Sequence, residues 1–186
     1  MNNKVINKCI YTSQYKYKTG IIGIIGGIVL SIIVLFLCYC ILFIKDNDIK
    51  NVIGGIFSLI IFISFASYTF YRSIGNIILS KKIKNDINNN LKNSIQGKPY
   101  DIKISFSLPG VKNKCYSISN IRLIYKLDNE LITLWIDKIF STEKKIYKDT
   151  IIKLLKKETF DIFYLKTSKL ITNPLQIEKI INSYIK

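Results

Sequence analysis

Residues 21–44 read IIGIIGGIVLSIIVLFLCYCILFI, a run of 24 residues without a charged side chain. As a helix with about 1.5 Å of rise per residue, the run is about 36 Å long, and the hydrocarbon core of a bilayer is about 30 Å thick. A signal peptide would have a shorter apolar run followed by a cleavage site of small residues, and neither feature is present. The stretch therefore predicts a retained transmembrane helix over residues 20–44.

A second uncharged run, residues 52–71, reads VIGGIFSLIIFISFASYTFY and is followed by Arg72. It is about 30 Å long as a helix, which is enough for a second span. Its final aromatic residues and the arginine are typical of a membrane interface. Only the loop of residues 45–51 separates the runs, so the sequence predicts an antiparallel helical hairpin.

The placement of basic residues predicts the orientation of the hairpin. Four lysines occur in the tail of residues 1–19 and four basic residues follow the second span, whereas the loop has only two lysines, beside Asp46 and Asp48. Because basic flanks stay in the cytoplasm, we expect an integral, two-span membrane protein with both termini cytoplasmic. The absence of any N-x-S/T glycosylation triplet agrees with this orientation.

The composition excludes several classes of function. The chain has 186 residues, no histidine, four cysteines and a net charge of +16. Without histidine there is no imidazole for a catalytic triad or a metal site, and four scattered cysteines do not make a disulfide scaffold. The abundance of Ile, Lys, Asn and Tyr, with only two arginines, indicates an A/T-rich genome, as in a low-GC bacterium, a parasite, an organelle or a large DNA virus. A viral chain would lie in a host or virion membrane.

Small residues recur at four-residue steps inside both spans. They are Gly23, Gly27 and Ser31 in the first span, and Gly54 and Ser58 in the second. This spacing lets two helices approach closely in lipid. We expect the two spans to pack on each other through these residues, with a homo-oligomer or another membrane protein as the alternative partner.

The cysteines have separate expected roles. Cys38 and Cys40 are interpreted as small apolar fillers of the first span, and Cys115 has no nearby partner in the sequence. Cys9 lies on the expected cytoplasmic side and is a candidate for acylation. No structural disulfide is expected.

Residues 72–97 are predicted to form an amphipathic linker helix, because Ile83, Ile87, Leu91 and Ile95 recur at four-residue steps. A break within the asparagine run of residues 88–90 is an alternative. The helix is either a stalk or lies along the membrane. Lys81, Lys82 and Lys84 are candidate contacts for anionic headgroups, although ordinary flanking charge explains them as well.

Residues 98–186 are predicted to form one small cytoplasmic α+β domain. Alternation of apolar and polar residues indicates strands over 100–108, 116–127 and 131–140, and a fourth over 159–166. A phase slip near Ser119 indicates a bulge. Helices are expected over 143–157, or over a shorter stretch capped by Asp149, and after Asn173, which we place at an N-cap.

The helix over 143–157 would carry a basic face, whose lysines are Lys145, Lys153, Lys156 and Lys157. Such a face suits anionic headgroups or an acidic partner, and an ordinary solvated surface is the alternative. Nucleic acid is disfavoured, because the face lacks arginines and interleaved aromatic side chains.

The order of hairpin, β-rich domain and C-terminal helix resembles small bacterial membrane proteins with a pleckstrin-homology-like domain. In that comparison, Asn173, Pro174 and the helix after them look like the closing helix of the barrel. The stretch FDIFYL over 160–165, followed by Asn173 and Pro174, is also similar to the end of a widespread uncharacterised membrane-associated β domain. Neither resemblance brings catalytic residues, and we assign no family on this basis.

The sequence therefore predicts a membrane hairpin that carries a small non-catalytic domain, with no cofactor and no metal. Our leading hypothesis is an anchor or scaffold whose domain holds a protein partner. The alternative is a domain that reads anionic lipid headgroups. An enzyme is the third option, which a pocket gathering Cys115 or a buried lysine with acids would favour.

Overall fold

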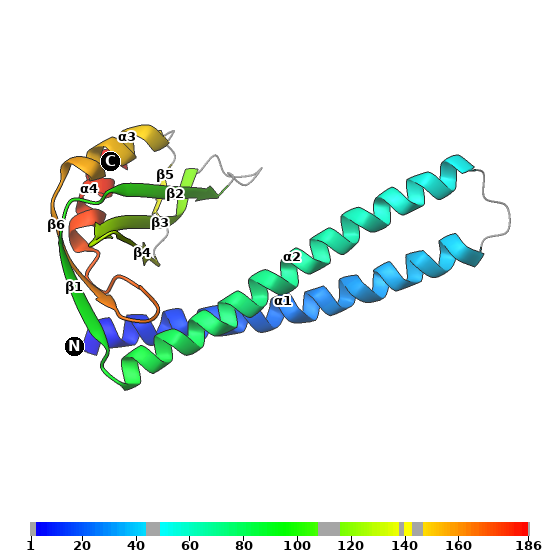
Figure 1. The fold of residues 1–186 in the computed structure, drawn as a ribbon, viewed down its shortest axis with the longest axis horizontal. Helices are drawn as coiled ribbons and strands as arrows, with labels where there is room; N and C mark the ends of the chain where they lie inside the picture. The colour runs from blue at the N-terminus through cyan, green and yellow to red at the C-terminus, as the bar shows by residue number, and fades with distance from the viewer. Residues whose placement is uncertain (1–2, 44–48, 108–115, 138–139, 143–146, 186) are drawn as a thin grey trace. The chain divides into compact units, whose positions relative to one another are not determined.

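A computed structural model describes residues 3–43, 49–107, 116–137, 140–142 and 147–185. The chain divides into two compact units. One unit is residues 11–81, and the other is residues 82–186 together with residues 1–10. The first unit is a helical hairpin, and the second contains a small antiparallel sheet with two helices (Figure 1).

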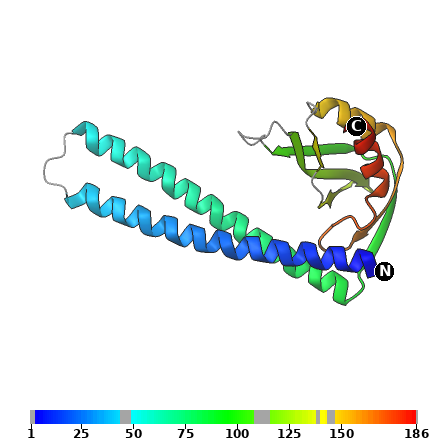
Figure 2. The same cartoon turned by 180° about the vertical axis from the view of Figure 1, so that it is seen from behind.

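The hairpin is built from α1 (Asn3–Phe43) and α2 (Ile49–Asn88). The two helices run antiparallel as neighbours in both views (Figures 1 and 2). Each helix is about 60 Å long, roughly twice the thickness of a hydrocarbon core. Both helices therefore continue well beyond the uncharged runs of the sequence.

The contact between α1 and α2 follows a seven-residue repeat of small buried residues. These are Ser13, Gly20 and Gly27 in α1, and Ala66, Ser73 and Ser80 in α2. The two series match in antiparallel order, since Ser13 Oγ lies 3.0 Å from Ser80 Oγ and Gly20 faces the Ser73 carbonyl. Small residues at every seventh position let the backbones of an antiparallel pair approach closely. We call these six residues the hairpin seam.

The described residues of the second unit form six strands, in a two-stranded and a four-stranded sheet. They are β1 (Lys92–Gly97), β2 (Asp101–Ser107), β3 (Tyr116–Leu127), β4 (Glu130–Ile136), β5 (Phe140–Thr142) and β6 (Phe160–Leu165). β3 pairs with β2 on one side, and with β4 and then β5 on the other. Asp128 and Asn129 form the β3–β4 turn with φ of 44° and 69°, as a two-residue hairpin turn requires. The expected bulge is confirmed, because Ser119 is the extra residue where the β2–β3 register shifts.

Residues 170–172 join the β1–β6 pair to the larger sheet. The Ile171 N–H donates to Trp135 of β4 at 2.9 Å, and the Leu165 N–H of β6 donates to Leu170 at 2.9 Å. The spatial order is therefore β2, β3, β4, residues 170–172, β6 and β1. Because only residues 98–100 separate β1 from β2 along the chain, the sheet curls strongly around its core.

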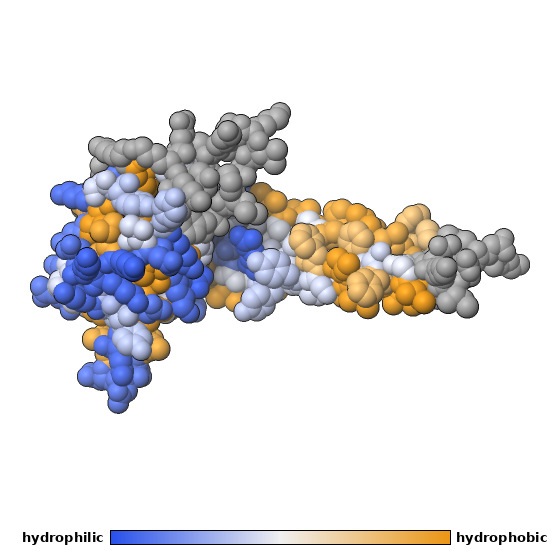
Figure 3. All heavy atoms as spheres, turned by 90° about the horizontal axis from the view of Figure 1, so that it is seen from above, coloured by the Kyte–Doolittle hydropathy of each residue, from blue (hydrophilic) through white to orange (hydrophobic). Residues whose placement is uncertain are grey.

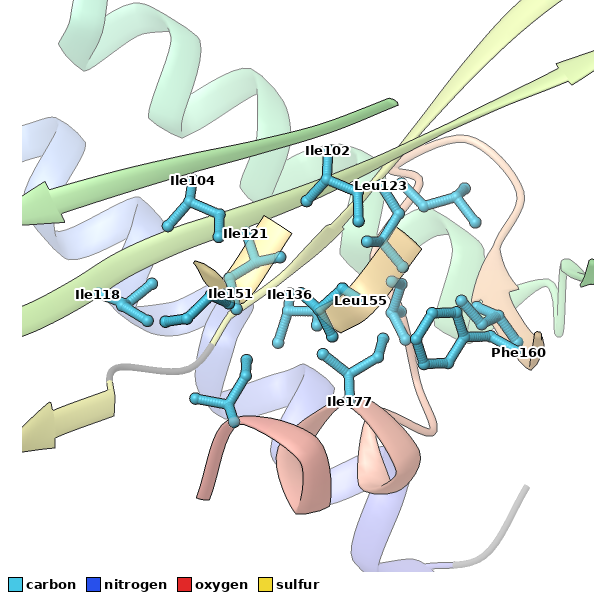
Figure 4. Packing of buried hydrophobic residues seen from close by; sticks show 14 of the residues in the cluster. Ile102, Ile104, Ile118, Ile121, Leu123, Ile136, Ile151, Leu155, Phe160 and Ile177 are labelled. Atoms are coloured by element: carbon cyan, nitrogen blue, oxygen red, sulfur yellow. The ribbon is translucent and has the colours of Figure 1, made fainter. Parts of the chain in front are cut away.

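The core lies between the curved sheet and two helices, α3 (Lys148–Lys157) and α4 (Leu175–Ile185). The alternating residues Ile102 and Ile104 of β2 point inward, as their period-2 pattern predicts, and meet Ile121 and Leu123 of β3 (Figure 4). Ile151 and Leu155 of α3 and Ile177 of α4 complete the core. The expected architecture of two long apolar helices, an antiparallel sheet and a C-terminal helix is thus confirmed.

The linker helix predicted over 72–97 is wrong over its last nine residues, 89–97. α2 ends at Asn88, the backbone turns at Asn90 with a φ of 51°, and residues 92–97 form strand β1. Ile95 therefore lies in the sheet core and not on a helix face. The break falls at the asparagine run, where the alternative interpretation placed it. The compact domain consequently begins before residue 98.

Smaller differences concern element ends. The strand predicted over 131–140 is divided between β4 and β5, and α3 begins at Lys148 with Tyr147 at the N-cap. Asn173 does not cap α4. Its side chain accepts the Phe163 N–H at 2.6 Å and donates to the Asp161 carbonyl at 2.9 Å, so it satisfies the free edge of β6. The first i→i+4 bond of α4 is accepted by the carbonyl of Pro174.

Candidate functional site

The outward faces of the hairpin form the largest apolar surface of the described chain (Figure 3). Both helices are long and apolar enough to cross a membrane, and only 11% and 6% of their apolar windows are buried inside the structure. Helices in the core of a soluble protein would be mostly buried, so this is not a core pair. We call the following exposed residues the apolar collar: Ile21, Ile22, Ile25, Ile28, Val29, Ile32, Ile33, Leu35, Phe36, Tyr39, Ile53, Ile56, Phe57, Ile60, Ile61, Ile63, Phe65, Tyr68 and Tyr71.

Amphipathic residues lie next to the apolar collar, before it on α1 and after it on α2. On α1 the exposed rings of Tyr11, Tyr15 and Tyr17 precede it, and the Lys16 ammonium lies 5.9 Å from the Tyr15 ring centroid. On α2 the exposed Arg72 follows Tyr71 directly. Aromatic rings and long basic side chains in this arrangement are typical of a water–lipid boundary.

The small residues predicted for helix packing divide into two groups. A Cβ added at Gly23 would strike the Ser73 hydroxyl, and one added at Gly27 would lie 2.9 Å from the Phe70 ring, so both glycines serve the α1–α2 contact. Ser31 donates to the Gly27 carbonyl within its own helix. Gly54 has no heavy atom within 4 Å of its Cβ position, and Ser58 is exposed, donating to the Gly54 carbonyl. Neither of these faces α1.

The prediction from sequence does not include most of the hairpin seam. The seam follows a seven-residue repeat, whereas the prediction uses four-residue steps. Ser13, Gly20, Ala66, Ser73 and Ser80 were not singled out. A search for small residues at steps of seven, in opposite directions along the two helices, finds them.

The predicted basic face of α3 is only partly free. Lys156 forms an ion pair with Asp101 of β2 at 3.0 Å. Hydrogen bonding from Lys156, together with the Ile102 N–H, lowers the pKa of the Asp101 carboxyl. Lys153 and Lys157 are exposed and make no ion pair with any described residue, and Lys145 lies outside the described residues. Lys81, Lys82 and Lys84 are exposed on α2.

The cysteines lie in different surroundings. Cys9 has 3% of its surface exposed, a burial that disfavours the acylation suggested for it, since an acyltransferase needs an accessible thiol. Cys38 and Cys40 are half-buried free thiols of α1. Cys115 lies outside the described residues. Within the described part of the chain, no group of three His, Cys, Asp or Glu side chains forms a metal site.

Asp86 is a buried carboxylate that sequence analysis did not single out. It lies in the last turns of α2 with none of its surface exposed. Both of its oxygens accept the Thr167 N–H at 3.1 Å, and Oδ2 accepts the Ser168 N–H at 2.7 Å. The Ser168 carbonyl accepts the Trp135 indole N–H at 2.7 Å. Asp86 therefore fastens the turn at residues 166–169, which in turn holds β4. Its separation of 81 residues from Thr167 gives no local pattern by which to find it.

Comparison with known proteins gives no assignment: no protein-family model, curated protein or solved structure matches this chain. Neither resemblance given above therefore gains support, and the function has to be argued from the residues alone.

Proposed function

We propose that this chain is an integral membrane protein whose hairpin crosses the bilayer twice and whose small α+β domain binds a protein partner, without catalysis. The observation that carries the proposal is the apolar collar. A large apolar side chain contributes about 1.5–3 kcal/mol when it leaves water, so the collar as a whole amounts to tens of kcal/mol. The net stability of a folded domain is only about 5–15 kcal/mol. Exposure of the apolar collar to water would therefore cost more free energy than folding supplies, and lipid around the collar removes that exposure.

The dimensions of the hairpin suit a bilayer. From Tyr17 to Tyr39 the helix rises about 33 Å, which is close to the thickness of a hydrocarbon core with its boundary rings. The hairpin seam continues outside this range through Ser13 and Ser80, so the two helices stay paired beyond the apolar collar. Residues 72–81 accordingly serve as part of a paired stalk and do not lie along the membrane.

We place both termini in the cytoplasm. The flanking charges Lys16, Lys18 and Arg72 adjoin the apolar collar on the side of the termini, and basic residues near spans stay cytoplasmic. The loop between the helices would then face the opposite compartment.

We assign binding to the domain because three of its described acids have structural roles. Asp86 holds a backbone turn, Asp101 pairs with Lys156, and Glu178 pairs with Lys8 at 3.7 Å. A chain without histidine that uses its acids in this way has few groups for proton transfer.

Recognition of anionic lipid is the second candidate, which the exposed Lys81, Lys82 and Lys84 favour. Lys81 stands ten residues beyond Tyr71 on one continuous helix, a rise of about 15 Å. The headgroup layer is about 5–8 Å thick, and charges are screened over about 8–10 Å. Lysines at this height gain little from headgroups, so we favour a protein partner.

The test of the membrane assignment is extraction of the full chain from membranes at alkaline pH. We expect the chain to stay in the pellet with lipid. Release as a soluble species would contradict the proposal.

Orientation is tested with cysteine variants in a background free of native cysteines. Asn47→Cys in the loop and Lys186→Cys at the tail are labelled with a membrane-impermeant maleimide on intact cells or vesicles. We expect labelling of the two positions from opposite sides, and labelling of both from one side would refute a two-span hairpin.

A further inference from the structure

The outer edge of β1 carries unpaired backbone groups in a regular pattern. The Lys166 N–H donates to the Leu91 carbonyl at 3.2 Å, which fixes the parity of the antiparallel β1–β6 ladder. Asn93, Ile95 and Gly97 then bond to β6, since the bonds of an antiparallel ladder alternate. The N–H and C=O groups of Lys92, Ser94 and Gln96 point away from β6, and in the described chain no other segment pairs with them.

The opposite edge of the β1–β6 pair is fully occupied. The Phe163 carbonyl accepts the Thr172 N–H at 2.8 Å, and the Phe163 N–H donates to Asn173. The Asp161 N–H donates to Gln176 at 3.3 Å. The backbone of residues 170–172 and the side chains of Asn173 and Gln176 thus occupy this edge of β6, whereas no described group does so along β1. An open edge of this kind pairs readily with another strand.

A shallow hollow adjoins this edge, lined by Lys92, Asn93, Ser94 and Phe163. Phe163 is paired with Ser94 across the ladder, and 46% of its surface is exposed. The pair does not exchange backbone bonds, so its side chains lie close together. An apolar side chain of an added strand would rest on the Phe163 ring, two positions from the ammonium of Lys92.

The net positive charge of the domain indicates which kind of strand would pair with β1. Residues 82–186 carry twenty basic and ten acidic side chains, and Lys92, Lys98 and Lys166 lie on or beside β1. Two copies of so basic a domain repel each other, which disfavours pairing of β1 with β1 of a second copy. An acidic strand is attracted instead.

We infer that the outer edge of β1 binds an extended acidic segment of a partner protein, which adds to the sheet as a further strand. The inference rests on the proposed function and names the class of its partner. Lys92, Ser94 and Gln96 supply the backbone bonds, Phe163 takes an apolar residue, and Lys92 takes a carboxylate on the same face.

The test uses the full chain in lipid nanodiscs and the acetylated, amidated hexapeptide Thr-Glu-Thr-Val-Thr-Glu. Its two Glu and its Val share one face of a strand. A control peptide, Thr-Glu-Pro-Pro-Pro-Glu, keeps the charge and lacks the central N–H groups that pairing needs in either strand direction. We expect the first peptide alone to slow amide exchange at residues 92, 94 and 96. Equal binding of both peptides, or no protection by the first, would overturn the inference.

Ser94→Pro tests the edge directly. It removes an outward N–H and leaves the β1–β6 ladder intact, which protection of the Asn93 and Ile95 amides verifies. We expect Ser94→Pro to weaken binding about tenfold, as the loss of one or two hydrogen bonds implies. Lys92→Glu should weaken it as well, and Lys126→Glu, a charge reversal on β3, should not. Unchanged affinity in Ser94→Pro would refute the edge as the site.

A second copy as occupant is tested by Ser94→Cys. Efficient disulfide formation between two copies in nanodiscs would also overturn the inference, and its absence supports a different partner. The proposed function is tested by separate experiments, which are alkaline extraction and cysteine labelling. A chain that resists extraction but does not protect its β1 amides would refute only the edge site.

Discussion

At the scale of single residues, the domain depends on polar groups far from any local motif. Asp86 is buried with no basic partner among the described residues, and three contacts from two backbone N–H groups compensate its lost hydration. Hydrogen bonds to an ionised acceptor are among the stronger ones in proteins. Trp135, the single tryptophan, donates to the same turn and therefore provides a spectroscopic probe of it.

Asp86→Asn should destabilise the domain by about 1–3 kcal/mol, because an amide NH₂ placed towards a backbone N–H leaves a buried donor unsatisfied. Urea unfolding of the full chain in detergent, followed by Trp135 fluorescence, measures the change. Amide exchange at Thr167 and Ser168 should rise in the same variant. Asp101→Asn, on the exposed ion pair with Lys156, is the control and should have a much smaller effect. Equal effects of the two substitutions would contradict the role given to Asp86.

Tyr125 has 3% of its surface exposed, and its hydroxyl has no hydrogen-bond partner among the described residues. Burial raises the pKa of this phenol to about 12, above its ordinary value of 10. The unfolded chain therefore loses this proton first, and stability falls as the pH rises from 10 towards 12. The loss reaches about 2–3 kcal/mol for this group.

Tyr125→Phe should remove that part of the pH dependence and leave stability at pH 7 unchanged or slightly higher, since an unpaired hydroxyl is removed. The measurement is urea unfolding of both proteins between pH 9 and pH 11.5. Both proteins contain the same lysines, so lysine titration does not contribute to the difference between their stabilities. A parallel decline in both proteins would show that the phenol is not responsible.

At the scale of elements, the hairpin is held by the seam and presents its glycines on two different sides. A Cβ at Gly20 would lie 2.8 Å from the Ser73 carbonyl oxygen, whereas Cβ positions at Gly26 and Gly75 meet no heavy atom within 4 Å. The same residue type therefore has opposite consequences at positions six residues apart. Of these three positions, close approach of the two helices requires glycine only at Gly20.

Gly20→Ala should destabilise the α1–α2 pair by about 1–3 kcal/mol, the usual cost of overpacking. Gly26→Ala should leave it unchanged or more stable, because alanine favours a helix by up to about 1 kcal/mol. Thermal unfolding of the full chain in detergent, followed by helical circular dichroism, compares the two variants. Equal stability of the two would refute the hairpin seam.

At the scale of the whole molecule, the domain includes chain that the sequence assigned to the linker. β1 supplies Ile95 to the core and pairs with β6 along six residues. The compact unit therefore starts near residue 82 and includes the end of α2 with Asp86.

A fragment of residues 98–186 should accordingly fail to fold, because it lacks β1 and Asp86. A fragment of residues 82–186 should retain a cooperative thermal transition and dispersed amide signals in its NMR spectrum. Cooperative unfolding of the shorter fragment would show that β1 is dispensable. Loss of structure in both fragments would assign residues 1–10 an essential part in the domain.

The predictions from sequence succeeded where a pattern is local. The period-2 alternation of residues 101–107, the bulge at Ser119 and the turn at Asp128 and Asn129 follow from side chains adjacent in the chain. The assignment failed at residues 92–97, because isoleucines at four-residue steps suit the face of a helix and Ile95 suits a buried strand equally well. Among the candidate site residues, Gly23 and Gly27 lie at the α1–α2 contact, whereas Gly54 and Ser58 do not.

The sequence by itself determined the two apolar helices and the sheet-and-helix character of the domain, because hydropathy and its period are properties of neighbouring residues. The tertiary structure decided the burial of Asp86 against a turn 81 residues away, the covered edge of β6 and the edge of β1 with which no described segment pairs. Those features depend on which backbone groups meet after folding. No periodicity along the chain encodes such meetings.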